Sequence, residues 1–163
     1  MAKELLNDYQ KGYIHCLCRA VSLGIRKVTD DIDELCFEVS ASEKEFKAAI
    51  KPIANQYDVH LYIDHYEQEI RVNGSGRILQ VDSDGKRREV EFDTKGEEKI
   101  YHLPGFALIL YKREEDLDKL LKHIHSKRKP TPERHREVGR LYGYGEKEIE
   151  EFIERFNEDV HST

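Results

Sequence analysis

The chain has 163 residues, of which 38% are hydrophobic and 37% charged, with a formal net charge of −6 at pH 7. This length predicts one compact domain, and the mixture of charge signs argues against both intrinsic disorder and indiscriminate binding to nucleic acid. No apolar run approaches the ~18 residues of a membrane span, no signal peptide opens the chain, and three unpaired cysteines predict a cytoplasmic location.

Two helices and two strands are predicted in the first part of the chain. Helical spacing of apolar residues predicts a helix over about 2–23. The alternating segment 33–40 predicts a half-buried strand, and the apolar segment 59–63 predicts another. Between them, the capping box of Ser42 opens a helix that is expected to reach about residue 57, with a kink or a split at Pro52. Residues 33–63 therefore read as a β-α-β unit with a right-handed crossover.

A β-hairpin is predicted in the middle of the chain. Asp84-Gly85 suits a type I′ turn, in which both central residues have positive φ. A two-residue turn there sets the register, and the expected cross-strand partners are Leu79 with Val90, Val81 with Arg88, and Asp82 with Arg87.

The last part of the chain is predicted to be a central strand followed by three helices. Segment 105–111 is the most apolar strand, which favours a central place in a sheet, and a helix is expected over 114–126. After the linker 126–131, Thr131 caps a helix that runs to about residue 142. Gly143 and Gly145 break the chain before a final helix over about 146–160. The apolar stripe of that helix is expected to be buried against segment 105–111 or the helix after it, and it consists of Ile149, Phe152, Ile153, Phe156 and Val160.

These elements predict the α+β class: a mixed β-sheet packed by helices, with a C-terminal two-helix hairpin. Residues 1–126 are expected to form the α+β domain. Residues 131–160 are expected to form the helical hairpin and to pack on that domain as one structural unit.

The hairpin has the outline of a DNA-binding helix-turn-helix. With Gly143 as the turn glycine, Gly139 occupies the small position four residues earlier, and Val138, Ile149 and Phe152 fall on apolar positions. The residues that would face the major groove, however, are Glu146, Lys147, Glu150, Glu151 and Glu154, and four of these five are carboxylates. Because DNA binding is driven by cations that replace counterions, no sequence-specific binding to duplex DNA is expected.

Charge is strongly segregated over this hairpin. Residues 122–140 hold seven basic residues against two acidic ones, and residues 143–163 hold seven acidic residues against two basic ones. The basic segment either neutralises the acidic helix or meets phosphates of a nucleotide or nucleic acid. The candidate anion- or partner-binding residues are Lys127, Arg128, Lys129, Arg134, His135, Arg136, Arg140 and Tyr144.

The histidines and cysteines do not suggest a metal site. His123 and His125 are two residues apart on a predicted helix and therefore diverge, as do Cys16 and Cys18. No second pair of Cys or His completes four ligands, and no nucleotide-binding or hydrolase motif is present. The sequence thus predicts no cofactor, no metal and no catalytic residue.

Three functions remain open on these observations. The favoured one is a non-enzymatic interaction protein that engages a protein partner through its charged C-terminal hairpin. The alternative is a binder of nucleic acid or a nucleotide through segment 122–140. The second alternative is a small enzyme with a diffuse site near His135, Arg136 and Arg140. A homo-oligomer is also left open by the sequence.

Overall fold

The computed structural model describes residues 4–33, 41–81 and 87–161. Three strands form an antiparallel sheet in the order β1-β5-β2, with bounds Val28–Thr29, Lys99–Tyr111 and His60–Val72. Two further strands, β3 and β4, form a second antiparallel sheet, with bounds Ser75–Val81 and Arg87–Asp93. The predicted α+β class is confirmed. All strand pairs within the described residues are antiparallel, so no parallel pair makes the sheet a mixed one there.

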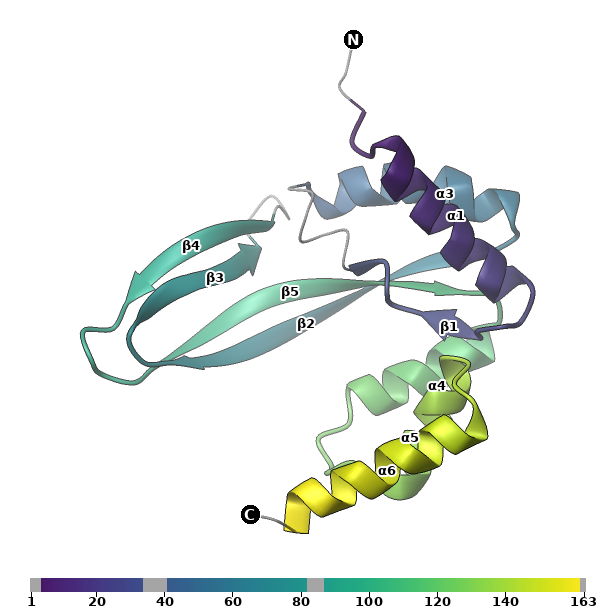
Figure 1. Cartoon of the computed structure of the whole chain (residues 1–163). Helices are drawn as coiled ribbons and strands as arrows, with labels where there is room; N and C mark the ends of the chain where they lie inside the picture. Colours follow the sequence, from purple (N-terminus) through teal and green to yellow (C-terminus); the bar gives the residue numbers. More distant parts are fainter. Residues whose placement is uncertain (1–3, 34–40, 82–86, 162–163) are drawn as a thin grey trace.

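The helices lie on both faces of the three-stranded sheet (Figure 1). On one face lie α1 and α3, with bounds Asp8–Ser22 and Glu43–Gln56. On the other face lie α4, α5 and α6, with bounds Glu114–Ile124, Pro132–Leu141 and Glu146–His161. The β3–β4 sheet lies beside the outer ends of β2 and β5, away from the helices (Figure 1). Among the described helices, none combines the length and apolar character needed to cross a bilayer.

The second half of strand β5, residues 106–111, is buried on both of its faces. Leu108 and Leu110 join the core beneath α1 and α3, while Ile109 and Tyr111 join the core beneath α4 and α5. Because successive side chains of a strand point to opposite faces, a strand covered on both sides reads as a continuous apolar run. The central position predicted from segment 105–111 is therefore confirmed.

The first helix begins later than its apolar spacing predicts. Asn7 and Gln10 cap each other reciprocally: each side chain accepts a hydrogen bond from the other residue's backbone N–H, at 2.8 and 3.0 Å. This capping box satisfies free N–H groups at the helix end and places the start at Asp8. The buried stripe runs through Ile14, Leu17 and Val21.

The second helix, α3, has the predicted N-cap Ser42 but only half of the predicted capping box, because the Glu45 carboxylate accepts from the Ser42 hydroxyl instead of the Ser42 backbone N–H. Ser42 Oγ accepts a hydrogen bond from the Glu45 backbone N–H at 3.2 Å. Pro52 lies inside the helix, which remains a single element to Gln56 rather than splitting. The strand predicted over 33–40 falls almost entirely outside the described residues, and so does the β-α-β crossover that depended on it.

The β3–β4 hairpin is present, but its predicted register is wrong by one residue. Ile78 pairs with Val90, and Leu79 pairs with Glu89. Five residues separate Val81 from its partner Arg87, whereas the register of a two-residue turn requires an even number. The observed register places the ring of Phe92 over Gly76, where an added Cβ would lie 3.0 Å from Phe92 Cζ. In the observed register, the Phe92 ring therefore packs on Gly76 of the neighbouring strand.

Candidate functional site

The C-terminal hairpin is shaped by signals at both ends of α5. Thr131 Oγ1 accepts a hydrogen bond from the Arg134 backbone N–H at 3.2 Å, and Pro132 occupies the first turn, where its missing N–H has no cost. Gly143 ends the turn after α5 with φ +81°. A Cβ there would collide with the carbonyl oxygen of Ile25, so this turn also requires glycine for its close approach to the α1–β1 connection.

The two helices of the hairpin approach closely at Gly139. This glycine is buried, and an added Cβ would lie 2.8 Å from Ile149 Cγ1. Ile149 and Ile153 of α6 are buried against α5. The small residue that a helix-turn-helix outline requires at this position therefore has a steric role here. On its other side α5 contacts α4, and its Leu141 packs with Leu117.

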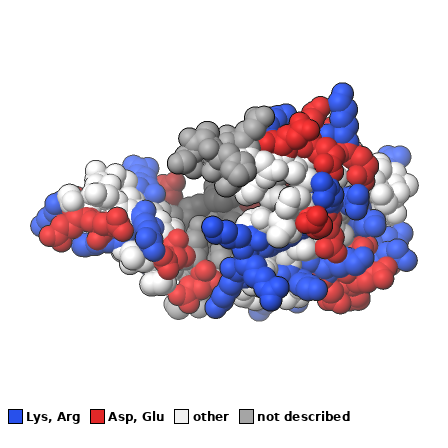
Figure 2. Space-filling view, turned by 90° about the horizontal axis from the view of Figure 1, so that it is seen from below, with Lys and Arg blue, Asp and Glu red and all other residues white. Residues whose placement is uncertain are grey.

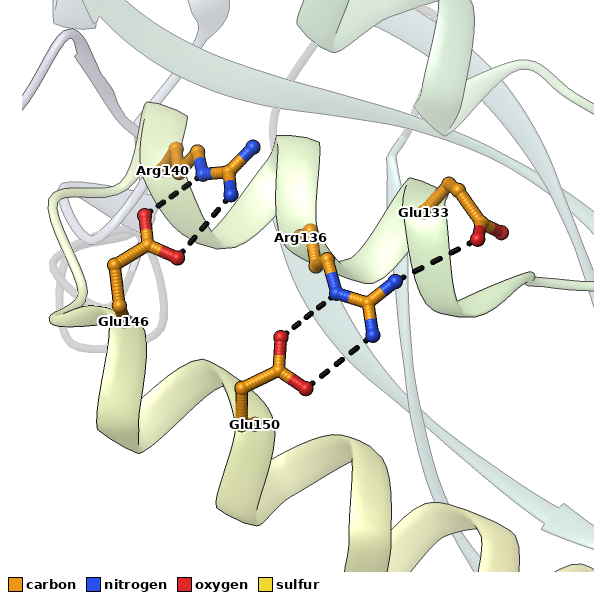
Figure 3. Close-up of polar contacts among 5 residues, drawn as sticks. All are labelled: Glu133, Arg136, Arg140, Glu146 and Glu150. Atoms are coloured by element: carbon orange, nitrogen blue, oxygen red, sulfur yellow. Dashed lines mark hydrogen bonds and ion pairs between the residues drawn. The ribbon is translucent and has the colours of Figure 1, made fainter.

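Two of the predicted basic site residues are paired with carboxylates of α6. Arg136 Nε lies 2.7 Å from Glu150 Oε1, and Arg140 Nε lies 2.8 Å from Glu146 Oε1. In each pair a second guanidinium nitrogen donates to the other carboxylate oxygen, at 3.3 and 3.1 Å respectively. Figure 3 shows the two pairs side by side, with Glu133 as a further partner of Arg136 at 3.5 Å. We call these two bidentate pairs the ion-pair ladder.

The ladder neutralises charge inside the hairpin. Hydrogen bonds from Arg140 and Arg136 hold the pKa values of Glu146 and Glu150 below their ordinary range. The positive charge of these two arginines is therefore already met by α6. For these two residues, the contacts are those expected if the basic segment neutralises the helix beside it. The ion-pair ladder also turns Glu146 and Glu150 toward α5, and these are two of the four carboxylates at the positions that would face DNA.

The other predicted basic residues divide into two groups. Arg134 donates hydrogen bonds to the carbonyl oxygens of His123 and Arg128, so it ties the linker to the end of α4. Lys127, Arg128 and Lys129 have exposed side chains in the linker, and within the described residues none of them forms an ion pair. Basic and acidic side chains lie next to one another over the face of the C-terminal helices, and neither sign covers it (Figure 2).

His135 is packed between aromatic rings rather than placed among the arginines. Its ring meets those of Phe156 and Phe152 edge to face, with centroids 4.8 and 5.2 Å away. Its Nε2 is buried and has no hydrogen-bond partner within the described part of the chain. Burial lowers the pKa of His135 below its ordinary value, and the neighbouring charge of Arg134 lowers it further. The imidazole is therefore held in its neutral form.

An open groove of about 470 Å³ runs between α5 and α6. We call it the α5–α6 groove, and it is lined by His135, Val138, Gly139, Tyr142, Tyr144, Glu148, Ile149, Phe152 and Arg155. Most of this lining is apolar or aromatic. Phe152 is 53% exposed and Tyr144 is 57% exposed, so two large rings stand at its mouth. The helical stripe of α6 predicts burial of Phe152, but Ile149 and Ile153 are buried, Phe156 is half-buried, and Phe152 stays more than half exposed.

The structure does not bring the predicted site residues of the hairpin together. His135 and Tyr144 line the groove, whereas Arg136 and Arg140 belong to the ladder and do not line it. The residues of the expected diffuse site, His135, Arg136 and Arg140, are thus divided between the groove and the ladder, and a catalytic role for them stays a prediction.

Sequence reasoning missed Tyr142, Glu148, Phe152 and Arg155 as site residues. Glu148, Phe152 and Arg155 share one side of α6 by helical period, and that was the available signal. Whether these side chains are exposed depends on where α5 lies, and the helical period of α6 does not predict the position of α5.

Two further carboxylates near this region, half-buried Asp30 and buried Asp64, were also missed by the sequence prediction. Tyr142 donates a hydrogen bond to Asp30 Oδ2 at 3.1 Å, and burial raises the pKa values of both groups. Asp64 on β2 is buried, and His125 Nε2 lies 2.8 Å from its Oδ1. These contacts hold the hairpin and the end of α4 on the sheet. Each is a pairing between residues distant in sequence, which a local pattern does not show.

Neither metal ligation nor a known relative accounts for this site. Within residues 4–33, 41–81 and 87–161, no group of three or more His, Cys, Asp or Glu side chains gathers as metal ligands would. Cys16 and Cys18 are free thiols. Comparison of the chain with protein-family models, with curated proteins and with solved structures gave no match in any of the three.

Proposed function

We propose that this chain is a non-enzymatic interaction protein that binds a protein partner through its C-terminal hairpin. The single observation that carries the proposal is the α5–α6 groove with Phe152 half-exposed at its mouth. Aromatic side chains at the centre of an apolar depression are the residues that most often dominate protein–protein binding energy. The cytoplasm is the proposed location, since the described cysteines Cys16 and Cys18 are unpaired thiols.

The distribution of charge supports a protein rather than a polyanion as the main partner. Arg136 and Arg140 already face two carboxylates of α6, and the chain carries a net charge of −6. Contact with phosphates would require these ion pairs to open while α6 remains close by. A partner that presents apolar side chains to the groove meets no such opposition. Sequence-specific binding to duplex DNA stays excluded from the proposal for the same reason.

A site-specific crosslink tests the proposal. A photoreactive benzoylphenylalanine replaces Phe152 in the full chain, expressed in cells that naturally produce it. The matched control carries the same group in place of Lys147, whose side chain is exposed on the same helix but does not line the groove. We expect covalent adducts with protein from position 152 and not from position 147. Equal adduct formation at both positions, or none at position 152, would reject the groove as the contact surface.

A second candidate function rests on the linker. Lys127, Arg128 and Lys129 are exposed and, within the described residues, carry no ion pair, so they remain available to a nucleotide or nucleic-acid backbone. Filter binding to single-stranded and double-stranded nucleic acid at several salt concentrations tests this function. Reversal of the three to Glu should abolish any salt-dependent binding.

The control for that measurement applies the same charge change elsewhere. Lys44, Lys47 and Lys51 are exposed on α3, on the opposite face of the sheet (Figure 1). Their reversal to Glu should leave binding unchanged if the linker is the contact. An equal loss in both triple variants would mean that overall charge alone governs the binding, and the linker would then have no specific role.

A further inference from the structure

The charges on one side of α6 are arranged so that two antiparallel copies of the helix would complement each other. Glu148 and Arg155 both line the α5–α6 groove, and Phe152 lies between them. The two charged residues are seven positions apart, which is about two helical turns or ~10.5 Å along the axis. Opposite charges thus flank an exposed aromatic ring at nearly equal distances. When two such helices pack antiparallel about the ring, the acidic end of each meets the basic end of the other.

Glu148 and Arg155 can each still bind a group of opposite charge. Arg155 is exposed and forms no ion pair in the part of the chain that the structure describes. Glu148 accepts one hydrogen bond, from the Gly145 backbone N–H at 3.3 Å to its Oε2, and among the described residues its Oε1 has no partner. The other arginines of the hairpin differ, since Arg136 and Arg140 are bound bidentately. Glu148 and Arg155 thus differ from the charged residues of the ladder, because neither has an oppositely charged partner within the described residues.

Two large exposed rings line the groove, since Tyr144 and Phe152 are both more than half exposed. Ile25 is 63% exposed, and its backbone lies directly against Gly143, in the turn that also carries Tyr144. Soluble monomers seldom leave large side chains exposed side by side, and such patches usually mark an interface.

We propose that a second copy of this chain occupies the α5–α6 groove, with the two α6 helices antiparallel across a two-fold axis near Phe152. This inference rests on the proposed function and names its partner. In this arrangement Glu148 faces the partner's Arg155, and the same contact is repeated by symmetry. Each Phe152 ring enters the groove of the other copy, beside Val138 and Tyr144. Two ion pairs flank an apolar centre, the usual arrangement of core and rim in an interface.

Charge reversal tests this pairing because a symmetric dimer predicts rescue. Sedimentation equilibrium of the purified full chain should show a dimer. In the Glu148→Arg dimer, the new arginine faces the partner's Arg155, and symmetry repeats this repulsive contact. In the Arg155→Glu dimer, the new glutamate faces the partner's Glu148, again at two symmetric places. Each single variant should raise the dimer dissociation constant at least about tenfold. The double variant restores both opposite-charge contacts, and its dissociation constant should return to near that of the parent.

The double variant also excludes a folding artefact. It contains both substitutions, so any damage they do to α6 is still present when dimerisation returns. Lys147→Glu, on the side of α6 away from the groove, is the matched control and should leave the dimer intact. A monomeric parent, single variants that remain dimeric, or a double variant that stays monomeric would each overturn the inference.

Failure of this inference is distinguishable from failure of the proposed function. If the parent is a monomer but the photoreactive group at position 152 captures a different protein, the function stands and the second copy is rejected. If the parent is a monomer and position 152 gives no adduct, both are rejected. An adduct with the mass of two chains, together with rescue by charge reversal, supports both.

Discussion

At the scale of single residues, His135 shows how burial sets the sensitivity of the hairpin to pH. Its ring packs against two phenylalanines and its pKa lies below the ordinary value. As pH falls, the unfolded chain takes up this proton first, near pH ~6.5, while the folded chain resists it. The contribution of His135 to stability is therefore fully present above that pH. It is lost as pH falls toward the lower pKa of the folded state.

This expectation is checked by urea unfolding at about pH 7.5 and about pH 5.5, on either side of the ordinary histidine pKa. His135→Leu should reduce the loss of stability between the two conditions, because it removes a group whose protonation opposes folding. His60→Asn, at an exposed histidine, is the control and should leave the difference nearly unchanged. Equal pH dependence in the parent and the His135 variant would contradict the argument.

Gly139 provides a second prediction at this scale. Alanine would favour the helix by about 1 kcal/mol over glycine. The new Cβ would lie 2.8 Å from Ile149 Cγ1, however, and overpacking of this kind costs about 1–3 kcal/mol. We expect Gly139→Ala to lower the free energy of unfolding by about 1 kcal/mol. Gly12→Ala in α1, where a Cβ meets nothing within 4 Å, should raise it. A stabilised Gly139 variant would show that the helices can move apart at no cost.

At the scale of elements, the ion-pair ladder governs how α5 and α6 meet. Arg136→Glu combined with Arg140→Glu would place new carboxylates against Glu133, Glu146 and Glu150. We expect a lower melting temperature, partly recovered by salt because these groups are exposed and therefore screened. In the parent, the pKa values of Glu146 and Glu150 are lowered, so the ladder stabilises at neutral pH and weakens as acid protonates them.

The matched control for the ladder makes the same charge change in the linker. Lys127→Glu with Lys129→Glu alters two exposed residues without an ion pair in the described part of the chain. This variant should melt close to the parent. If both double variants lose the same stability, the ladder contributes nothing beyond net charge.

At the scale of the whole molecule, the two sheets differ in how many side chains they bury. The three-stranded sheet has a buried core on both faces. Among the described side chains of β3 and β4, none is buried, and Ile78, Val90 and Phe92 are only half-buried. Figure 1 shows the β3–β4 sheet lying away from the helices. Regions with few buried contacts open at lower free energy than the core.

Native-state hydrogen exchange measures this difference. Backbone amides of β3 and β4 should exchange much faster than those of residues 106–111 in β5. Their exchange should also respond to low denaturant concentrations that leave β5 unaffected. Equal protection in the two sheets would mean that the molecule opens as one cooperative unit.

The sequence alone determined the features that depend on neighbouring residues. Ser42 and Thr131 cap their helices as predicted, and segment 105–111 is the central strand. Caps act over three residues through backbone hydrogen bonds, and a doubly covered strand must be apolar throughout. The hairpin and its glycine turn at Gly143 were likewise readable, because a tight turn and a close helix approach restrict the residue type.

Only the tertiary structure decided which side chains meet across elements. The sequence showed that Arg136 and Arg140 are basic and four residues apart, but not that two carboxylates of α6 lie within 3 Å of them. It predicted that Phe152 belongs to a buried stripe, yet α5 leaves that ring exposed at the groove. The helical period gives the direction in which each side chain points around the axis of its own helix. Burial and pairing depend on where a second helix lies, and that position is set by long-range packing at Gly139 and Gly143.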